Sequence, residues 1–343
     1  MGEVKKIKTI EDATAAERKR DHIDMALNSQ VLYAENDCRF YYEPMLNGHP
    51  VGEYPKINFL EKQFNFPIWV SSMTGGTALA GKINENLARA CKDFGLGMGL
   101  GSCRQLLYDE TYLADFQVRQ YIGDQPLYAN LGIAQVEKLV LEKKWDVFSR
   151  LIDKLSADGL IVHVNPLQEW MQPEGDNIFN PPIDTIETFL QFTNIPLIVK
   201  EVGQGMGKES LRKLLQLPLA AIDFAAIGGT NFSKLELSRN LAEKAVFEPM
   251  VKVGHTAYEM TLMVNQLCEE MPENIKCKQI IISGGIKDFL DGYHLINLCK
   301  LPSLYGQASQ FLKYAMDDYE KLYQYVLHQT EGLQMAKRFL TLK

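Results

Sequence analysis

Eight short apolar runs between residues 67 and 309 constrain the fold of this chain more than any other feature of its sequence. Glycine or proline bounds each run, and stretches of helical period separate them, which is the pattern of βα units around a parallel sheet. Eight such units in about 250 residues predict a closed α/β barrel of the (β/α)8, or TIM-barrel, type. An open doubly wound sheet stays possible, because closure is not visible in local sequence. The predicted strands are residues 67–73, 96–102, 126–132, 160–165, 196–203, 219–227, 278–285 and 302–309.

Helical periodicity fills the segments between these runs. The spacing i, i+4, i+8 and i+11 after the first run is formed by Ile83, Leu87, Cys91 and Phe94. The pattern returns in residues 288–299, and we expect further helices at the C-terminus. Residues 1–60 precede the first strand and contain a helix candidate at residues 14–29. We therefore predict one barrel domain over residues 1–343, with residues 1–60 as an N-terminal arm or cap that contributes to the active site.

Composition excludes several classes of function. With 46% hydrophobic and 23% charged residues, the chain can bury a large core. A formal net charge of -7 argues against nucleic acid as a partner, because phosphate backbones bind basic faces. No apolar run reaches the roughly 18 residues of a membrane span, and the N-terminus lacks the apolar core of a signal peptide. The six cysteines include no CxxC pair, so we expect reduced thiols in a soluble cytoplasmic protein without a membrane partner.

The carboxyl ends of the predicted strands are unusually polar, and in a barrel these ends form the active site. They carry the sequences SSMTGGT, GSCRQ, ANLG, HVNPLQE, VKEVGQG, GGTNF, SGGIK and GQAS. Glycines let main-chain N–H groups approach an anion, and hydroxyl groups add donors for phosphate oxygens. A single glycine pair is usually only a tight turn, but its repetition at successive strand ends favours a phosphate-binding mouth. The hydroxyl residues are Ser72, Thr74, Ser102, Thr230 and Ser283.

Two charged residues interrupt the apolar strand sequences. Lys200 lies in PLIVKEVG, where a buried ammonium would be costly without an anionic partner. Because neighbouring strand residues point to opposite sides, we favour a bound anion over an ion pair with Glu201. Asp223 lies inside LAAIDFAAI and could equally be a hydrogen-bonded buried carboxylate.

Residues 163–176, HVNPLQEWMQPEGD, form the most polar of these strand exits. Loops are commonly polar, but here the polar groups begin on the apolar strand LIVHVN. Glu169 offers a hard carboxylate oxygen, and Mg²⁺ usually binds through one or two such groups together with substrate phosphate. Gln168 and His163 are candidates for orienting a substrate. We predict that this segment belongs to the active site.

Together these motifs resemble the type 2 isopentenyl-diphosphate isomerase family. The resemblance runs from about Arg18 to Leu312 and rests on RKRDHID, SSMTGG, GSCR, ANLG, HVNPLQE with QPEGD, VKEVG, GGTNF and SGGIK. HVNPLQE with the N-terminal RKRDHI is specific, whereas SGGIK and GGT are general to phosphate-binding barrels. The family implies a barrel enzyme that isomerises isopentenyl diphosphate to dimethylallyl diphosphate in isoprenoid biosynthesis. It further implies reduced FMN, Mg²⁺ bridging protein and substrate diphosphate, NADPH as reductant, and a homo-oligomer of four or eight copies.

The resemblance also implies roles for individual residues. Gln168 would lie beside the reacting carbons as the catalytic residue, and Glu169 would hold the metal. Glu236 matches an acidic position of the family. The implied substrate contacts are Arg18, Lys19, His22, Ser102, Cys103, Arg104, His163 and Gln168. The implied flavin contacts are Ser72, Met73, Thr74, Ser102, Asn130, Lys200 and Thr230, with Gly284, Gly285, Ala308 and Ser309 around the phosphate.

The chain departs from the family pattern at four positions. Cys103 replaces a glutamine, which affects one substrate contact. Lys287 replaces an arginine, which keeps the charge but loses the bidentate fork for phosphate. Ala226 stands for a glycine and Phe232 for a tryptophan. None of these changes removes a group that the chemistry needs.

Three other classes of function stay open. A 2-hydroxy-acid oxidase would need a histidine and arginine pair in a late loop, and His255 has no such arginine close by in the sequence. A nucleotide-reducing barrel would need a nucleophilic cysteine, for which Cys103 is the candidate. A non-catalytic flavin or phosphate binder would leave isopentenyl diphosphate unchanged.

Overall fold

The structure is a computed structural model that describes residues 14–72, 75–239 and 241–343. The chain divides into two compact units, which are described separately here. The first comprises residues 14–41 with Lys343, and it contains the helix predicted at residues 14–29 as α1 (Ala15–Met25), followed by the 3-10 turns η1 (Ala26–Asn28) and η2 (Tyr33–Glu35). The second unit comprises residues 42–342. A single domain over the whole chain stays a prediction.

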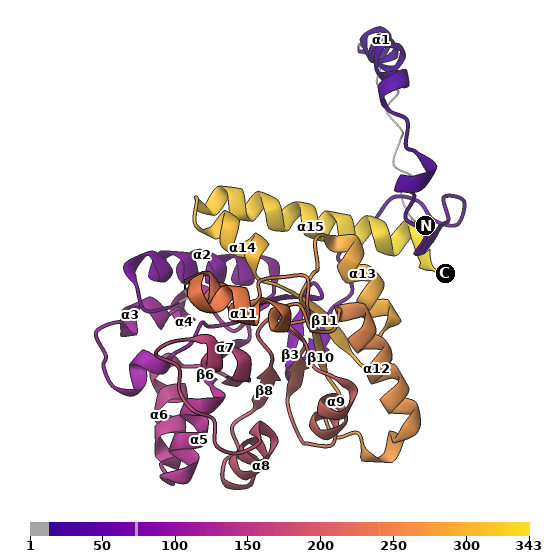
Figure 1. The fold of residues 1–343 in the computed structure, drawn as a ribbon. Helices are drawn as coiled ribbons and strands as arrows, with labels where there is room; N and C mark the ends of the chain where they lie inside the picture. Colours follow the sequence, from indigo (N-terminus) through magenta and orange to yellow (C-terminus); the bar gives the residue numbers. More distant parts are fainter. Residues whose placement is uncertain (1–13, 73–74, 240) are drawn as a thin grey trace, which may run out of the picture. The chain divides into compact units, whose positions relative to one another are not determined.

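Eight parallel strands of the second unit close into a barrel, which confirms the predicted (β/α)8 fold (Figure 1). Neighbours in the barrel are neighbours in the chain, and the last strand returns to the first. Each strand overlaps one of the eight predicted runs. The strands are β4 (Ile68–Val70), β5 (Gly97–Gly99), β6 (Leu127–Gly132), β7 (Gly159–His163), β8 (Leu197–Lys200), β9 (Ala221–Asp223), β10 (Ile280–Ser283) and β11 (Ser303–Gln307).

Helices surround these strands (Figure 1). They are α2 (Ala78–Phe94), α3 (Leu113–Phe116), α4 (Arg119–Ile122), α5 (Ile133–Leu141), α6 (Trp145–Leu155), α7 (Pro166–Met171), α8 (Pro182–Phe192), α9 (Lys208–Leu215), α10 (Phe232–Arg239), α11 (Leu241–Val251), α12 (Ala257–Glu270), α13 (Phe289–Leu298), α14 (Ser309–Ala315) and α15 (Tyr319–Phe339). The remaining short elements are β1 (Phe40–Tyr42), β2 (Ile57–Phe59), β3 (Lys62–Phe64), β12 (Leu340–Leu342), η3 (Arg104–Leu107) and η4 (Pro272–Asn274). Among the described residues, the helices lack an apolar stretch of the length that a membrane span requires.

The predicted apolar face of α2 is buried against the barrel. The four residues at helical spacing, Ile83, Leu87, Cys91 and Phe94, are all buried. Thr77 caps the start of the helix by accepting a hydrogen bond from the Ala80 N–H group. Gly95 ends it with a φ of 64°, a left-handed conformation that glycine adopts without steric cost.

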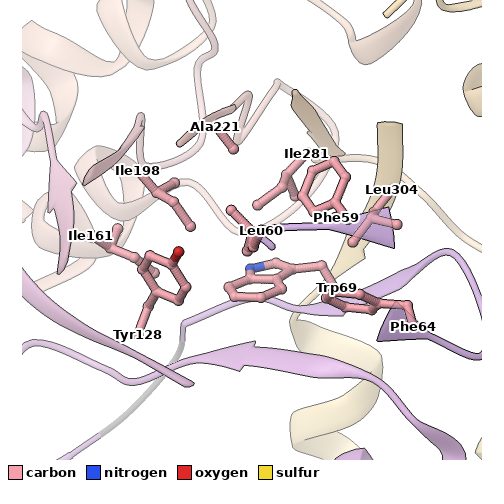
Figure 2. Packing of buried hydrophobic residues seen from close by; sticks show 10 residues of the cluster. All are labelled: Phe59, Leu60, Phe64, Trp69, Tyr128, Ile161, Ile198, Ala221, Ile281 and Leu304. Carbon is pink, nitrogen blue, oxygen red and sulfur yellow. The ribbon is translucent and has the colours of Figure 1, made fainter. Parts of the chain in front are cut away.

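A β-hairpin closes the amino-terminal end of the barrel. β2 pairs with β3 in antiparallel fashion, and the hairpin buries Phe59, Leu60 and Phe64. Figure 2 shows these side chains packed with Trp69, Tyr128 and aliphatic residues that point inward from the strands. The Leu60 N–H group donates to the Gln279 side chain just before β10. The barrel interior at the amino-terminal ends of the strands is therefore filled by side chains.

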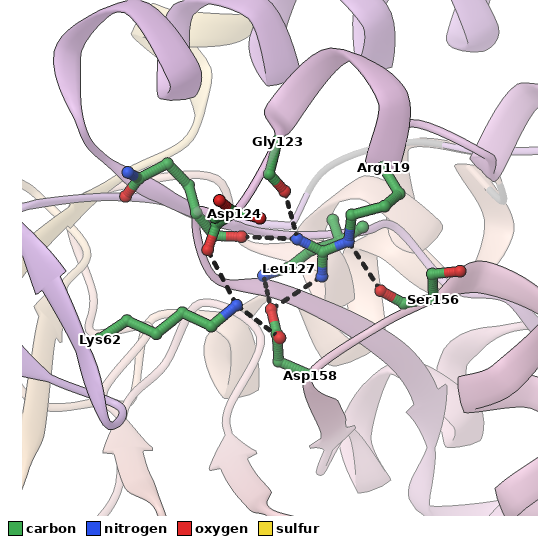
Figure 3. Close-up of polar contacts among 8 residues, drawn as sticks. Lys62, Arg119, Gly123, Asp124, Leu127, Ser156 and Asp158 are labelled. Atoms are coloured by element: carbon green, nitrogen blue, oxygen red, sulfur yellow. Dashed lines mark hydrogen bonds and ion pairs between the residues drawn. The ribbon is translucent and has the colours of Figure 1, made fainter.

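Asp158, just before β7, holds three segments together at this closed end (Figure 3). Its carboxylate accepts hydrogen bonds from Lys62 at 2.6 Å, from Arg119 at 2.8 Å and from the Leu127 N–H group at 2.8 Å. Burial opposes ionisation of this carboxyl, but the bonds from Lys62 and Arg119 outweigh burial and lower its pKa. Asp158 therefore fixes the hairpin and the start of β6 to the start of β7.

Replacing this carboxylate should destabilise the fold. We expect Asp158→Asn to lower the free energy of unfolding by about 2–3 kcal/mol, because two partly buried cations lose their counter-ion. Asp146→Asn is the matched control and should change stability little, because Asp146 pairs with Arg150 in solvent, where its side chain is 65% exposed. Urea unfolding followed by tryptophan fluorescence measures both. Equal losses in the two variants would contradict the role of Asp158.

Candidate active site

Two adjoining pockets lie at the carboxyl ends of the strands. We call the first the glycine-lined pocket, because residues 228–229 and 284–285 form part of its wall. We call the second the His163 pocket. Ser72, Lys200, Val202 and Phe232 line both pockets, so the two form one continuous mouth.

Most of the predicted site residues of the barrel unit lie in this mouth. The glycine-lined pocket contains Ser72, Lys200, Thr230, Gly284, Gly285, Ala308 and Ser309. The His163 pocket contains Ser72, Ser102, Asn130, His163, Gln168 and Lys200. Met73 and Thr74 lie outside the described residues. Arg18, Lys19 and His22 lie on α1 of the other unit, so their role at the mouth stays a prediction.

The glycine-lined pocket suits a ligand that carries a phosphate. Gly284 has a φ of 93°, and a Cβ atom there would lie 2.1 Å from the main-chain oxygen of Ala226, so the turn after β10 accepts only glycine. This close packing brings main-chain groups to the pocket wall. The hydroxyl groups of Ser71 and Ser72 are buried and have no hydrogen-bond partner within the described chain. They can bind polar atoms of a ligand.

Lys200 ends β8 inside the mouth and is only 6% exposed. Its Nζ atom donates to the main-chain oxygen of Glu201 at 2.7 Å. The Glu201 carboxylate is occupied elsewhere, because it accepts hydrogen bonds from the N–H groups of residues 203, 204 and 205. No carboxylate of the described residues forms an ion pair with Lys200, so the alternative of a pair with Glu201 is absent and the bound anion stays a prediction.

His163 enters the mouth from the end of β7 as a neutral base. Asn130 donates from Nδ2 to the main-chain oxygen of Leu100, which directs its Oδ1 atom toward His163 Nδ1 at 2.7 Å. The imidazole proton therefore lies on Nδ1, and Nε2 is left as an acceptor. Burial lowers the pKa of His163 to about 3, and the nearby charge of Lys200 adds to this effect.

Asp223 and Ser283 form a polar pair at the ends of β9 and β10. Asp223 is fully buried, and its Oδ1 atom accepts a hydrogen bond from the Ser283 hydroxyl group. Lys200 is aligned with Asp223 in the register of β8 and β9, and His163 is aligned with Lys200 across β7 and β8. Three ionisable residues therefore stand at the same height on three neighbouring strands.

Gln168 lines the His163 pocket and is held between Glu236 and Asn165. Its Nε2 atom donates to Glu236 on α10 at 3.2 Å, and its Oε1 atom accepts from Asn165 at 3.1 Å. Asn165 also donates to Glu169 at 2.9 Å, whose second oxygen accepts the Asp176 N–H group at 2.8 Å. These contacts fix the orientation of the Gln168 amide. The polar segment follows β7 as expected, but part of it forms the helix α7, which the sequence analysis did not predict.

Glu169 is buried without a cationic side chain beside it among the described residues. Within that part of the chain, no group of three or more His, Cys, Asp or Glu side chains is arranged to hold a metal ion. A magnesium ion here would take its remaining ligands from substrate oxygens and water, which is common for Mg²⁺.

Two predicted substrate residues of the barrel unit, Cys103 and Arg104, lie outside both pockets. The Cys103 side chain is fully buried, and its thiol donates to the Gly101 main-chain oxygen at 3.4 Å. Its N–H group donates to the Asn130 main-chain oxygen at 2.7 Å, so neither donor is left for a substrate. Burial raises the pKa of this thiol to about 12, which argues against a nucleophilic thiolate. Arg104 forms an ion pair with Asp176 at 2.9 Å.

Gln307 is a pocket residue that the sequence analysis did not single out. It ends β11, lines the glycine-lined pocket and is only 3% exposed. Its amide donates to the Ile286 main-chain oxygen at 3.3 Å and accepts from the Tyr325 hydroxyl group at 2.9 Å. A glutamine at the end of the apolar run SLYGQ was the available signal.

Comparison with known proteins gives relatives along most of the chain. No model of a protein family matches it. An isopentenyl-diphosphate delta-isomerase of Rickettsia felis is 35% identical over 312 residues, covering 89% of this chain and 87% of the relative. The protein of the same name from Rickettsia rickettsii (strain Sheila Smith) is 36% identical over 315 residues, with the same two shares. That of Rickettsia prowazekii is 34% identical over 309 residues, covering 87% of this chain and 86% of the relative.

Solved structures are similar in fold at low sequence identity. A mandelate oxidase variant has a TM-score of 0.58 and 14% identity, covering 89% of this chain and 86% of its own. A flavocytochrome b2 variant with pyruvate bound has a TM-score of 0.60 and 14% identity, covering 88% and 72%. At this identity the likeness supports the barrel fold alone.

The neutral state of His163 predicts a pH dependence of stability. Because its folded pKa of about 3 lies below the ordinary value of 6.5, the unfolded chain binds a proton that the folded protein does not. The free energy of unfolding should therefore fall as the pH drops below about 6.5, with this group alone contributing about 2 kcal/mol between pH 7 and pH 5. Urea unfolding at the two pH values measures the change.

His163→Gln should show a smaller loss than the wild type over this interval, because the titrating group is gone. His328→Gln is the matched control, since His328 is exposed on α15, and it should keep the wild-type loss. Identical losses in the wild type and His163→Gln would show that His163 is not held neutral.

Proposed function

Because the chain belongs to the isopentenyl-diphosphate delta-isomerase family, we propose that it converts isopentenyl diphosphate to dimethylallyl diphosphate in isoprenoid biosynthesis. The reaction adds a proton to the terminal methylene carbon and removes one from C2, without net change in oxidation state. The observation that carries the proposal is the mouth in which the glycine-lined pocket adjoins His163 and Gln168. A cytoplasmic location and a homo-oligomer of four or eight copies stay predictions.

We assign the glycine-lined pocket to FMN. Gly284, Gly285, Ala308 and Ser309 would hold its phosphate, and the unpartnered hydroxyl group of Ser72 would meet the flavin ring. In the reduced form, bound FMN would supply proton exchange and an electron-rich ring beside the alkene, with NADPH as the source of electrons. The Lys200 ammonium favours a negative charge on the ligand, because no carboxylate of the described residues pairs with it.

We assign the other end of the mouth to the substrate diphosphate and Mg²⁺. Glu169 would hold the metal, since its buried negative charge lacks a cationic side chain among the described residues. Each charged hydrogen bond to the diphosphate would contribute roughly 1.5–3 kcal/mol. Within the barrel unit, the proposed diphosphate contacts are Ser102 and Arg104. Contacts from Arg18, Lys19 and His22 stay predictions from the family resemblance.

His163 and Gln168 have distinct parts in this proposal. Neutral His163 only accepts through Nε2, so it offers no donor to the diphosphate, and its predicted contact with the diphosphate is not part of the proposal. The positive charge that binds the diphosphate would come from arginine and metal. Gln168 orients the alkene, because Asn165 and Glu236 hold its amide in one direction. Closure of the mouth would exclude water, which could otherwise capture a developing cation.

The mouth favours this assignment over a 2-hydroxy-acid oxidase. An oxidase of that kind needs a histidine and arginine pair from a late loop, and among the described residues neither pocket wall contains such a pair. His255 also lies outside both pocket walls.

Oxidation-state dependence tests the proposed function. The purified protein with FMN, Mg²⁺ and isopentenyl diphosphate should form dimethylallyl diphosphate under anaerobic conditions when dithionite or NADPH reduces the flavin. It should be inactive with oxidised FMN, because the proposed chemistry requires the reduced ring. Product is measured by its acid lability or by NMR. No isomerisation by the reduced protein would refute the proposal.

Truncating Gln168 should lower turnover more than it lowers folding stability. We expect Gln168→Ala to reduce kcat of the reduced enzyme by about 10- to 100-fold, because the alkene loses its fixed orientation. Gln324→Ala, at an exposed glutamine of α15, is the matched control and should keep wild-type turnover. If both variants turn over at the wild-type rate, Gln168 has no role in positioning the alkene.

A further inference from the structure

Asp223 is a buried acid that the proposed reaction does not use. It ends β9, has no exposed surface and does not line the glycine-lined pocket. Its Oδ1 atom contacts the Ser283 hydroxyl group, while Oδ2 is buried without a hydrogen-bond partner in the described chain. An ionised carboxylate with one such oxygen is costly, because the charge has no compensating donor there.

Ser283 connects this acid to the pocket. It ends β10, lines the glycine-lined pocket and directly precedes Gly284. Its Oγ atom also accepts a hydrogen bond from the Ala225 N–H group at 2.9 Å. A serine hydroxyl group has a single proton to donate. While that proton is donated to the Asp223 carboxylate, none is left for a ligand in the pocket.

A proton on Asp223 reverses this arrangement. The protonated Oδ1 atom donates to Ser283 Oγ, and the hydroxyl proton of Ser283 can then be donated into the pocket. The unpartnered Oδ2 atom becomes a neutral carbonyl oxygen, which is less costly to bury than a charged one. An anion in the pocket is therefore bound better when Asp223 is neutral.

The groups around Asp223 shift its pKa in opposite directions. Burial raises its pKa, whereas the charge of Lys200 on β8, the hydrogen bond from Ser283 and the nearby Ala225 N–H group lower it. His163 on β7 is one strand further away and neutral. β10 presents Ile281 and Ser283, which do not ionise in this range. An anion that pairs with Lys200 reduces the effect of its charge on Asp223 and so favours protonation of Asp223.

We propose that Ser283 binds the phosphate of FMN and that this binding is coupled to the uptake of one proton by Asp223. The inference rests on the proposed function, which assigns the glycine-lined pocket to FMN. It gives the hydrogen-bonded pair of Asp223 and Ser283 a role in binding FMN, and it makes the affinity for FMN depend on pH. The proton comes from solvent, and no covalent bond changes.

Isothermal titration of FMN into the full chain freed of flavin tests the coupling. In two buffers of different ionisation enthalpy at pH 7, the wild type should take up close to one proton more per FMN than Asp223→Asn. The asparagine amide donates to Ser283 as the neutral carboxyl group would, so the variant should still bind FMN. Ionisation of the FMN phosphate is common to both proteins and cancels in the comparison. From pH 6 to pH 8, the wild-type Kd should rise relative to the variant by up to tenfold per pH unit.

Two further titrations show which part of FMN and which side chain the proton uptake requires. Riboflavin, which lacks the phosphate, should bind the wild type without the extra proton. Ser283→Ala should bind FMN about tenfold more weakly and also lose the extra proton, while its Kd for riboflavin changes by less than about twofold. This variant carries the test if Asp223→Asn does not fold.

Each contrary outcome has a separate meaning. Equal proton uptake by the wild type and Asp223→Asn, or between the wild type and Ser283→Ala, overturns the coupling. The same extra proton with riboflavin places the effect at the ring and overturns the assignment of Ser283 to the phosphate. Failure of the wild type to bind FMN overturns the proposed function itself, whereas FMN binding without the extra proton overturns this inference alone.

Discussion

The register of the parallel strands β7, β8 and β9 is the constraint on which the mouth depends. It places His163, Lys200 and Asp223 side by side at the ends of three successive strands. Because all strands of the barrel run in one direction, their carboxyl ends open into a single space. A neutral base, a cation and a buried acid therefore influence one another through a shared environment. A shift of one residue in any of these strands would turn its ionisable side chain away from the mouth.

The fold was predictable because its signal is local. Each apolar run needs only its own residues to indicate a strand, and the burial of Ile83 and Leu87 on α2 follows directly from helical spacing. Lys200 was also predictable as a residue without an ion-pair partner, since strand geometry separates it from the Glu201 side chain. Its actual partner is the main-chain oxygen of Glu201. That contact depends on the conformation of the loop after β8, which the sequence pattern does not predict.

The tautomers and side-chain orientations of the site residues were less predictable, because they depend on contacts between segments that are distant in the sequence. The tautomer of His163 is set by Asn130, which is 33 positions away, and the amide direction of Gln168 is set in part by Glu236, which is 68 positions away. Sequence motifs identify such residues as candidates but do not show what stands beside them. Cys103 illustrates the limit, because its motif suggests a substrate contact while the fold directs its side chain into the protein interior.

The hairpin at the amino-terminal end of the barrel separates two tasks within one fold. Phe59, Leu60 and Phe64 complete the hydrophobic core there with the protein's own side chains, and Asp158 fixes the hairpin in place. This core therefore needs no ligand to fill it. The two pockets of the mouth lie at the opposite end, so a substitution in their walls leaves these packed side chains untouched.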